Sequence, residues 1–121
     1  MQLFRIDETL VRAEGSRFME TWLGDGSPFF NVTVHVWQSG EEWPLHTHPQ
    51  DELFYYVEGE VLVRVEEEER MVEPGTWLFV PGNLKHGSRN VGEGRAVIMT
   101  FNSPNLAWRG EEGGNWVRWL E

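Results

Sequence analysis

The chain has 121 residues, with 20 acidic against 10 basic side chains and a formal net charge of −10. This length suits one domain with its own core, and the acidic surface should repel nucleic-acid backbones and anionic membranes. The sequence contains no cysteine, which excludes disulfides, iron–sulfur clusters, thiolate zinc sites and cysteine nucleophiles. Any bound metal would therefore need histidine and carboxylate ligands.

The overall composition favours an all-β fold. Apolar residues make up 40% of the chain, which also contains 13 glycines and 6 prolines, a mixture typical of many short strands joined by turns. No stretch is apolar enough to span a membrane, and the N-terminus lacks the apolar core of a signal peptide. We therefore expect a cytoplasmic protein that binds neither membranes nor nucleic acids.

The first predicted elements are short leading strands at residues 3–6 and 17–23, closed by a glycine-rich turn at 24–28. A longer strand follows from Phe29 to Trp37, where apolar and polar residues alternate. His35 lies on its polar face and has two interpretations. We favour a hydrogen-bonded or surface histidine, and the alternative is a role in a ligand pocket or beside a metal.

The segment from Gly40 to Gly59 concentrates the chemistry of the chain. His46 and His48 are two residues apart, so on an extended strand both imidazoles point to the same side. Glu52 follows after turn-forming residues that let the chain bend back towards the histidines. Two histidines and one carboxylate are a common ligand set for divalent transition metals.

A second segment, from Gly75 to Asn90, contains a hydrophobic strand that ends in a Pro81–Gly82 turn and is followed by His86. This histidine could supply a fourth ligand from another strand. Asn83 stands in the turn, where asparagine is the non-glycine residue that best tolerates a positive φ.

These two segments resemble the two motifs of the cupin superfamily. The first motif has glycine, five residues, histidine, one residue, histidine, three or four residues, glutamate, six residues and glycine, and the segment from Gly40 to Gly59 fits it throughout. The second motif fits at Gly75, Pro81, His86 and Asn90, whereas Asn83 replaces the usual glycine. Because asparagine tolerates the same backbone conformation, the departure should cost little.

The resemblance covers residues 30–101 and implies an antiparallel double-stranded β-helix, or jelly-roll barrel, as a single domain over residues 1–121. Residues 1–29 and 102–121 would then pack on the barrel or on a partner subunit. The resemblance also implies one divalent metal ion, which could be iron, manganese, nickel, cobalt, copper or zinc. Its four ligands would be His46, His48, Glu52 and His86.

Several side chains are candidates for the wall of a ligand pocket around this metal. Phe54 and Tyr56 share a strand face with Glu52, and His35 lies on the preceding strand. For Phe54 we favour a core position. Trp43, just before the first histidine, is either a pocket residue or a packing anchor, and both interpretations stay open.

The remaining predicted elements complete the barrel. Residues 61–65 and 70–73 form a hairpin with an acidic tip at 66–69, which we read as solvated surface that protects an edge. Strands follow at 76–80 and 95–101. In the tryptophan-rich tail, a helical turn would place Trp116, Trp119 and Leu120 on one face, packed on the barrel, on a partner or over the pocket as a lid. The apolar surface of the tail and leading strands predicts a homodimer.

The function expected from this ligand set is chemistry on a small polar organic molecule. An octahedral ion with four protein ligands keeps open positions for water, dioxygen or substrate. We expect a dioxygenase-like enzyme or a metal-dependent isomerase or decarboxylase, although no general base can be named from the sequence. The alternative is a non-catalytic cupin that binds or stores a small molecule with a structural or ligand-orienting metal.

Overall fold

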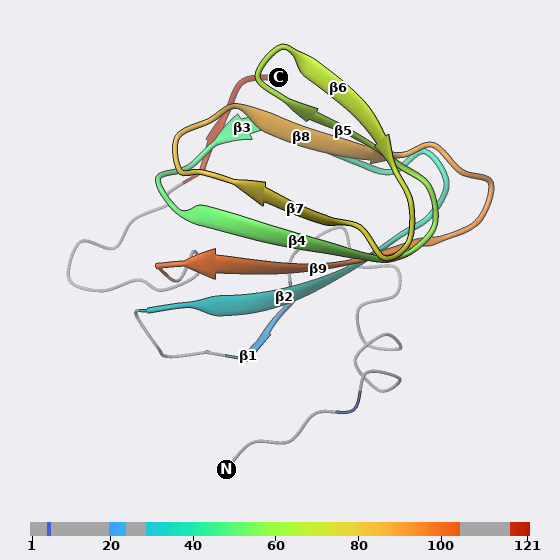
Figure 1. Cartoon of the computed structure of the whole chain (residues 1–121), viewed down its shortest axis with the longest axis horizontal. Helices are drawn as coiled ribbons and strands as arrows, with labels where there is room; N and C mark the ends of the chain where they lie inside the picture. Colours follow the sequence, from blue (N-terminus) through green and yellow to red (C-terminus); the bar gives the residue numbers. More distant parts are fainter. Residues whose placement is uncertain (1–4, 6–19, 24–28, 105–116) are drawn as a thin grey trace.

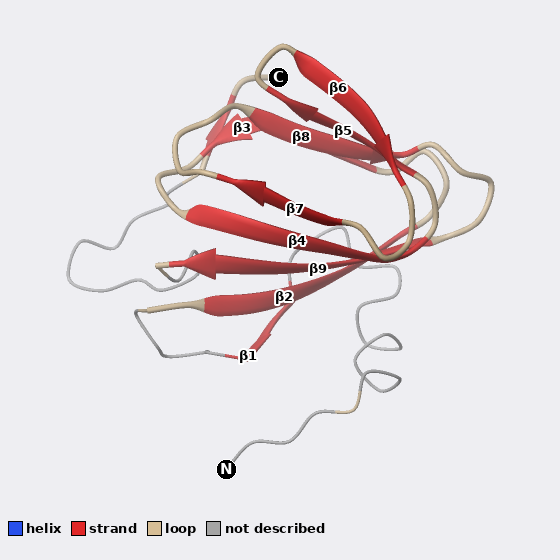
Figure 2. Ribbon diagram, in the orientation of Figure 1, coloured by secondary structure: helices blue, strands red, loops and turns tan. Residues whose placement is uncertain are grey.

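The computed structural model describes residue 5 and residues 20–23, 29–104 and 117–121 (Figure 1). These residues form strands, turns and loops, and the described part of the chain contains no helix (Figure 2). The strands are β1 (Glu20–Leu23), β2 (Asn31–Trp37), β3 (Glu42–Thr47), β4 (Asp51–Glu58), β5 (Val61–Val65), β6 (Glu68–Val72), β7 (Trp77–Val80), β8 (His86–Asn90), β9 (Ala96–Ser103) and β10 (Arg118–Trp119).

The strands build two five-stranded sheets that face each other. One sheet has the order β1-β2-β9-β4-β7 and the other has the order β10-β3-β8-β5-β6, with every neighbouring pair antiparallel. Figure 1 shows the two sheets as layers, with the chain crossing repeatedly from one to the other. This arrangement confirms the predicted all-β jelly-roll barrel.

The inner face of the first sheet is organised in transverse rows, because residues directly opposite in neighbouring strands share a face. Trp37 opposite Ala96 forms the row at one end, and the rows become more polar towards the other end. The next three rows are His35–Ile98–Tyr56, Thr33–Thr100–Phe54, and Asn31–Asn102–Glu52–Val80.

The core between the sheets is apolar near the first of these rows. Trp37, Tyr56, Ala96 and Ile98 pack there against Val61 and its neighbours on the second sheet. Both faces of β2 are buried, since Val34 and Val36 on its outer face pack against Val97 in a second cluster. The polar face of β2 is thus directed into the barrel rather than to solvent.

The turns between strands follow the motif spacing. Gly59 has a φ of 92°, and a Cβ at this position would lie 2.7 Å from the Cα of Ala96. Only glycine fits this turn without a backbone shift. Asn83 has a φ of 69°, which confirms that asparagine provides the left-handed turn that the second motif requires.

Two of the four edge strands of the described sheets, β6 and β7, differ in character. The edge strand β6 begins with Glu68 and Glu69, both exposed, and is joined to β5 by a tight turn at residues 66–67. The acidic segment therefore lies at a sheet edge, although half of it belongs to the strand rather than to the tip, and its protective role stays a prediction. By contrast, the edge strand β7 carries Trp77 and Phe79, which are 57% and 58% exposed.

The structure modifies two predictions for the ends of the chain. Of the leading segment, β1 pairs with β2, while the predicted strand at 3–6 lies almost wholly outside the described residues. The predicted helical turn in the tail is wrong for its described part, because Arg118 and Trp119 form β10 and pair with β3. Trp108 and Trp116 lie outside the described residues. No helix of membrane-spanning length and apolarity occurs in the described part.

Candidate metal centre

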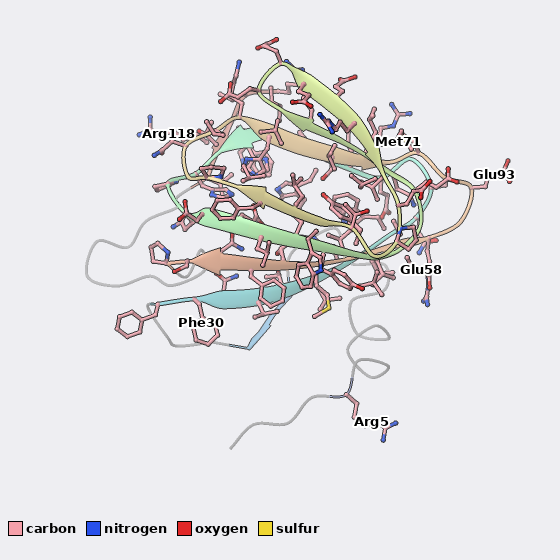
Figure 3. The ribbon with its side chains drawn as sticks, viewed as in Figure 1. Arg5, Phe30, Glu58, Met71, Glu93 and Arg118 are labelled. Atoms are coloured by element: carbon pink, nitrogen blue, oxygen red, sulfur yellow. The ribbon has the colours of Figure 1, made fainter. Side chains whose placement is uncertain are left out.

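Three residues of the predicted ligand set come from three different strands, the fourth directly follows one of them, and all four meet at one end of the barrel. His46 on β3 lies directly opposite His86, the first residue of β8, while Glu52 is on β4 of the other sheet. His48 follows immediately after β3. Arg118 of β10 marks the same end in Figure 3, whereas Glu58 and Glu93 lie at the far end of the barrel.

These side chains form a compact and buried group. One ligand atom from each residue lies within 4.8 Å of the others, which is close enough for a single ion to contact all four. Their exposed fractions are 3% for His46, 2% for His48, 5% for Glu52 and 4% for His86. Four polar side chains buried this close together need hydrogen-bond partners or a bound ion.

The second motif reaches the first through backbone contacts. The Asn83 N–H donates to the His48 carbonyl at 2.8 Å, and the Gly82 N–H donates to the Asp51 carboxylate at 2.8 Å. A Cβ on Gly82 would lie 2.1 Å from the Pro49 carbonyl oxygen, so the two turns are in close contact. This contact places His86 next to the first three residues.

The histidines are held in one tautomer by the backbone. The Nδ1 atoms of His46, His48 and His86 contact the carbonyl oxygens of residues 44, 50 and 84 at 2.7, 3.1 and 2.9 Å. A carbonyl oxygen only accepts, so each Nδ1 carries the hydrogen, and in a neutral imidazole the Nε2 then presents a lone pair. Such second contacts orient histidines in metal sites.

Glu52 supplies the negative charge of the group. Its Oε1 lies 3.0 Å from the Nε2 of His48 and 3.1 Å from the Nε2 of His86. Burial would raise the pKa of Glu52, but the contacts with these two histidines outweigh burial and lower the pKa to about 2. The carboxylate is therefore ionised at neutral pH.

The contacts of Glu52 have a direct chemical consequence. An ionised carboxylate only accepts hydrogen bonds, and each Nε2 of a neutral imidazole also only accepts. The two contacts are therefore favourable only when a cation or an additional proton lies between the atoms, and the low pKa of Glu52 depends on such a positive charge. Since burial, followed by the neighbouring His86, lowers the pKa of His46 to about 4, this third imidazole is neutral at pH 7 and can bind a metal. The donor set fits a divalent ion.

A small cavity of about 20 Å³ adjoins this group, with room for about one water molecule. Its wall combines aromatic and small polar side chains with the four residues of the candidate centre. The wall residues are His35, Trp37, Trp43, His46, His48, Glu52, Phe54, His86, Ser88, Ile98, Thr100 and Val117.

The structure places three of the four predicted pocket residues, His35, Trp43 and Phe54, in this wall. His35 is 6% exposed, so it is not a surface histidine, and burial lowers its pKa to about 4. Tyr56 is not part of this wall and belongs to the core cluster, where its ring stacks on that of Phe54 at 6.2 Å. Phe54 is in the same core cluster, as favoured from the sequence, and also contributes to the wall. Burial raises the pKa of Tyr56.

The tail closes one side of this region. Val117 contributes to the cavity wall, and the ring of Trp119 lies 5.2 Å from those of Trp43 and His46. β10 has only two residues paired with β3, and a further hydrogen bond joins the Leu120 N–H to the Leu45 carbonyl. This is the least extensively paired part of the described wall.

Some wall residues were not predicted from the sequence. Trp37 shares a strand face with His35, and Thr100 shares one with Ile98, so alternation alone could have indicated them. Ser88 and Val117 carry no such signal. Their positions depend on which strands become neighbours in the barrel.

Two antiparallel sheets with three histidines and a glutamate gathered at one end define a double-stranded β-helix barrel with a candidate metal centre. Residues 33–102 match the family described as the cupin domain. The chain therefore belongs to the cupin family.

Three individual proteins that this chain resembles share less than 30% of their residues with it. The chain is 28% identical to the protein TT1209 from Thermus thermophilus, whose crystal structure superimposes with a TM-score of 0.73 over 87% of this chain and 99% of that one. A double-stranded β-helix protein from Klebsiella pneumoniae shares the fold with a TM-score of 0.79 at 18% identity, over 100% and 98% of the two chains. Dimethylsulfoniopropionate lyase DddQ from Ruegeria pomeroyi is 26% identical over 80% of this chain, which spans 50% of that enzyme's length.

Proposed function

We propose that this cupin binds one divalent metal ion through His46, His48, Glu52 and His86 and uses it to transform a small polar organic molecule. The observation that carries this proposal is the convergence of acceptor atoms. Backbone carbonyls fix all three Nδ1 hydrogens, so the three Nε2 lone pairs and the Glu52 carboxylate face a common centre. A divalent cation satisfies all four at once.

The charge of the site favours an anionic ligand. A divalent ion with three neutral imidazoles and one carboxylate has a net charge of about +1. Among the described residues, the cavity wall contains no lysine or arginine, and burial keeps His35 neutral at pH 7. The metal would therefore be the main attraction for a carboxylate or an enolate oxygen of the substrate.

The reaction class is open among a few alternatives. A divalent ion in such a centre supplies Lewis-acid, oxygen-activating or water-activating chemistry. Our proposal is a dioxygenase-like enzyme or a metal-dependent isomerase or decarboxylase. The similarity to dimethylsulfoniopropionate lyase supports a further candidate reaction, the lyase cleavage of a small carboxylate. Iron, manganese, cobalt, nickel, copper and zinc all suit the ligands.

A second candidate, a non-catalytic binding or storage protein, is favoured by one feature of the cavity wall. Among the described residues, the cavity wall contains one carboxylate, Glu52, and we assign this residue to the metal. His35 is then the one wall residue outside the ligand set that could act as a base, and its low pKa makes it a weak one.

A turnover screen separates these candidates. The protein is loaded in turn with iron(II), manganese(II), nickel(II) and zinc(II) and incubated with small carboxylic acids, with and without oxygen. Product that forms only with oxygen supports a dioxygenase, and product that forms equally without oxygen supports a lyase, isomerase or decarboxylase. Tight ligand binding with no product under any condition supports the binding protein. The His48→Ala variant is the control for metal dependence.

We also propose that the protein is a homodimer. The exposed Trp77 and Phe79 on the edge strand β7 support this proposal, because an unpaired edge with large apolar side chains is a common site of association. A cytoplasmic location stays a prediction from the sequence.

A further inference from the structure

The row of the first sheet that contains Glu52 is polar across three neighbouring strands, β2, β9 and β4. Asn102 of β9 lies directly opposite Glu52 of β4, and Asn31 of β2 lies directly opposite Asn102. Residues opposite in antiparallel strands have Cβ atoms about 5 Å apart on the same face. The Asn102 amide is thus beside the candidate metal centre, inside the barrel, where Thr100 of the next row lines the cavity.

A second amide comes from the turn before β4. The Gln50 carbonyl accepts the Nδ1 hydrogen of His48 at 3.1 Å, so this residue already belongs to the framework of the candidate centre. Its side chain is 0% exposed, and that of Asn102 is 1% exposed. Both side chains are fully buried, next to the cavity wall rather than in it.

These two amides have unused hydrogen-bonding capacity. Neither the nitrogen nor the oxygen of either side-chain amide has a hydrogen-bond partner in the described part of the chain. Burying such groups without partners costs several times the contribution of a normal hydrogen bond, so proteins rarely do so without a purpose. Two apolar side chains would fill the same space at lower cost.

Asn90 shows how this chain treats a structural amide. Its side chain is also 0% exposed, but its Nδ2 donates to the carbonyls of Trp37 and Gly94 at 3.0 and 2.9 Å. Its Oδ1 accepts the N–H of Gly92 at 3.0 Å. The contrast with Gln50 and Asn102 indicates that the latter amides serve something other than the fold.

We propose that Gln50 and Asn102 form a polar subsite that binds the neutral end of the ligand whose anionic end is held by the metal. This inference rests on the proposed metal centre, because the wall, as far as the chain is described, offers no other cation for a carboxylate. An amide provides both a donor and an acceptor, so its natural complement is a group that does the same, such as a hydroxyl or a carboxamide. The substrate class is therefore a short carboxylate with a neutral hydroxyl or amide group.

The cavity is small, so the ligand enters when part of the wall moves. β10, with two paired residues and Val117 at the cavity, is the part most easily displaced. In this proposal the ligand, once bound at the metal, contacts the two buried amides from the side of the metal centre. Their lack of charge suits a site where Glu52 already supplies one negative charge.

The test compares two probes on nickel-loaded protein by calorimetric titration, 3-hydroxypropionate and propionate, which differ by one hydroxyl. Wild-type protein is expected to bind 3-hydroxypropionate at least about tenfold more tightly, the effect of one well-placed hydrogen bond to a buried group. The variants Asn102→Leu and Gln50→Met should lose this preference, while their affinity for propionate and for nickel stays within about twofold. A preference that survives in both variants would come from chelation by the metal and overturns the subsite.

Thermal unfolding of the metal-free proteins gives a second readout. Asn90→Leu should lower the Tm by about 5 °C or more, since it leaves buried partners without hydrogen bonds. Asn102→Leu should leave the Tm unchanged or raise it, and an equal loss in both variants shows a structural role and overturns the proposal. Failure of the wild type to bind nickel would instead refute the metal centre, and the subsite with it, so the two failures are distinguishable.

Discussion

Replacement of Glu52 by glutamine tests the chemistry of the candidate centre, because it removes the charge and keeps the shape. In the metal-free protein, the Oε1 of Glu52 lies 3.0 and 3.1 Å from two Nε2 atoms, and these contacts are unfavourable when both hydrogens are on Nδ1 and no additional proton lies between the atoms. A glutamine places an NH₂ group there, which can donate to both nitrogens. Two neutral hydrogen bonds of about 0.5–1.5 kcal/mol each would raise the free energy of unfolding by about 1–3 kcal/mol.

The measurement is differential scanning calorimetry at pH 7.5 after removal of metal with a chelator. We expect metal-free Glu52→Gln to unfold roughly 5 °C or more above metal-free wild type. Its affinity for zinc, measured by competition with a chromophoric chelator, should fall at least about 100-fold, beyond the effect of losing an outer partner of a ligand.

The matched control is Glu58→Gln at the far end of the barrel, where Glu58 forms a half-exposed ion pair with Arg95 at 2.6 Å. This variant should leave zinc affinity unchanged and alter the free energy of unfolding by less than about 1 kcal/mol. A metal-free Glu52→Gln protein less stable than wild type would refute the lone-pair argument. An unchanged zinc affinity would remove Glu52 from the ligand set.

Three further predictions concern pH, the tail and association. Burial lowers the pKa of His35 and His46 from 6.5 to about 4, so the unfolded chain binds more protons between these values. The free energy of unfolding of metal-free protein should therefore fall from pH 7 to pH 4 in urea titrations, on the order of 1–3 kcal/mol per histidine, and a flat profile would contradict this. Trp119→Ala should accelerate zinc loss to excess chelator severalfold with little change in Tm, because the ring covers His46; an unchanged rate would refute a covering role. Light scattering should give a dimer mass that Phe79→Lys reduces to that of a monomer, and a monomeric wild type would defeat the homodimer proposal.

Much of the fold could be predicted because the decisive signals are local. The glycines of the motifs mark turns with positive φ, and Asn83 provides such a turn in place of glycine. The i, i+2 spacing of His46 and His48 gives both side chains the same direction on an extended chain. These relations need no knowledge of distant strands.

Other features depend on contacts between distant segments. The alternation in β2 did not show that its polar face lies inside the barrel, where Thr33 contacts Thr100 through their hydroxyl groups. The spacing of the aromatic residues in the tail suggested a helical turn, but pairing of Trp119 with His46 makes it a strand. The structure of such a short segment depends on the strand with which it pairs and not on its local propensity.

The amides of Gln50 and Asn102, which lack hydrogen-bond partners among the described residues, could also not be predicted from the sequence. Asn102 lies outside the motif pattern, and its significance comes from the register that sets it opposite Glu52. Asn90, which is a motif residue, is by contrast hydrogen-bonded through both atoms of its amide. Residues that bind a ligand beside a metal are therefore found from the barrel and not from the motif alone.

The most direct test of the central claim is the metal content per chain. Protein purified without chelator and then saturated with zinc and desalted is analysed by elemental mass spectrometry, beside His48→Ala with its fold verified by circular dichroism. The account predicts about one metal ion per wild-type chain and most of it lost from the folded variant. A wild-type chain that takes up no metal, or a variant that keeps the same content, would contradict it.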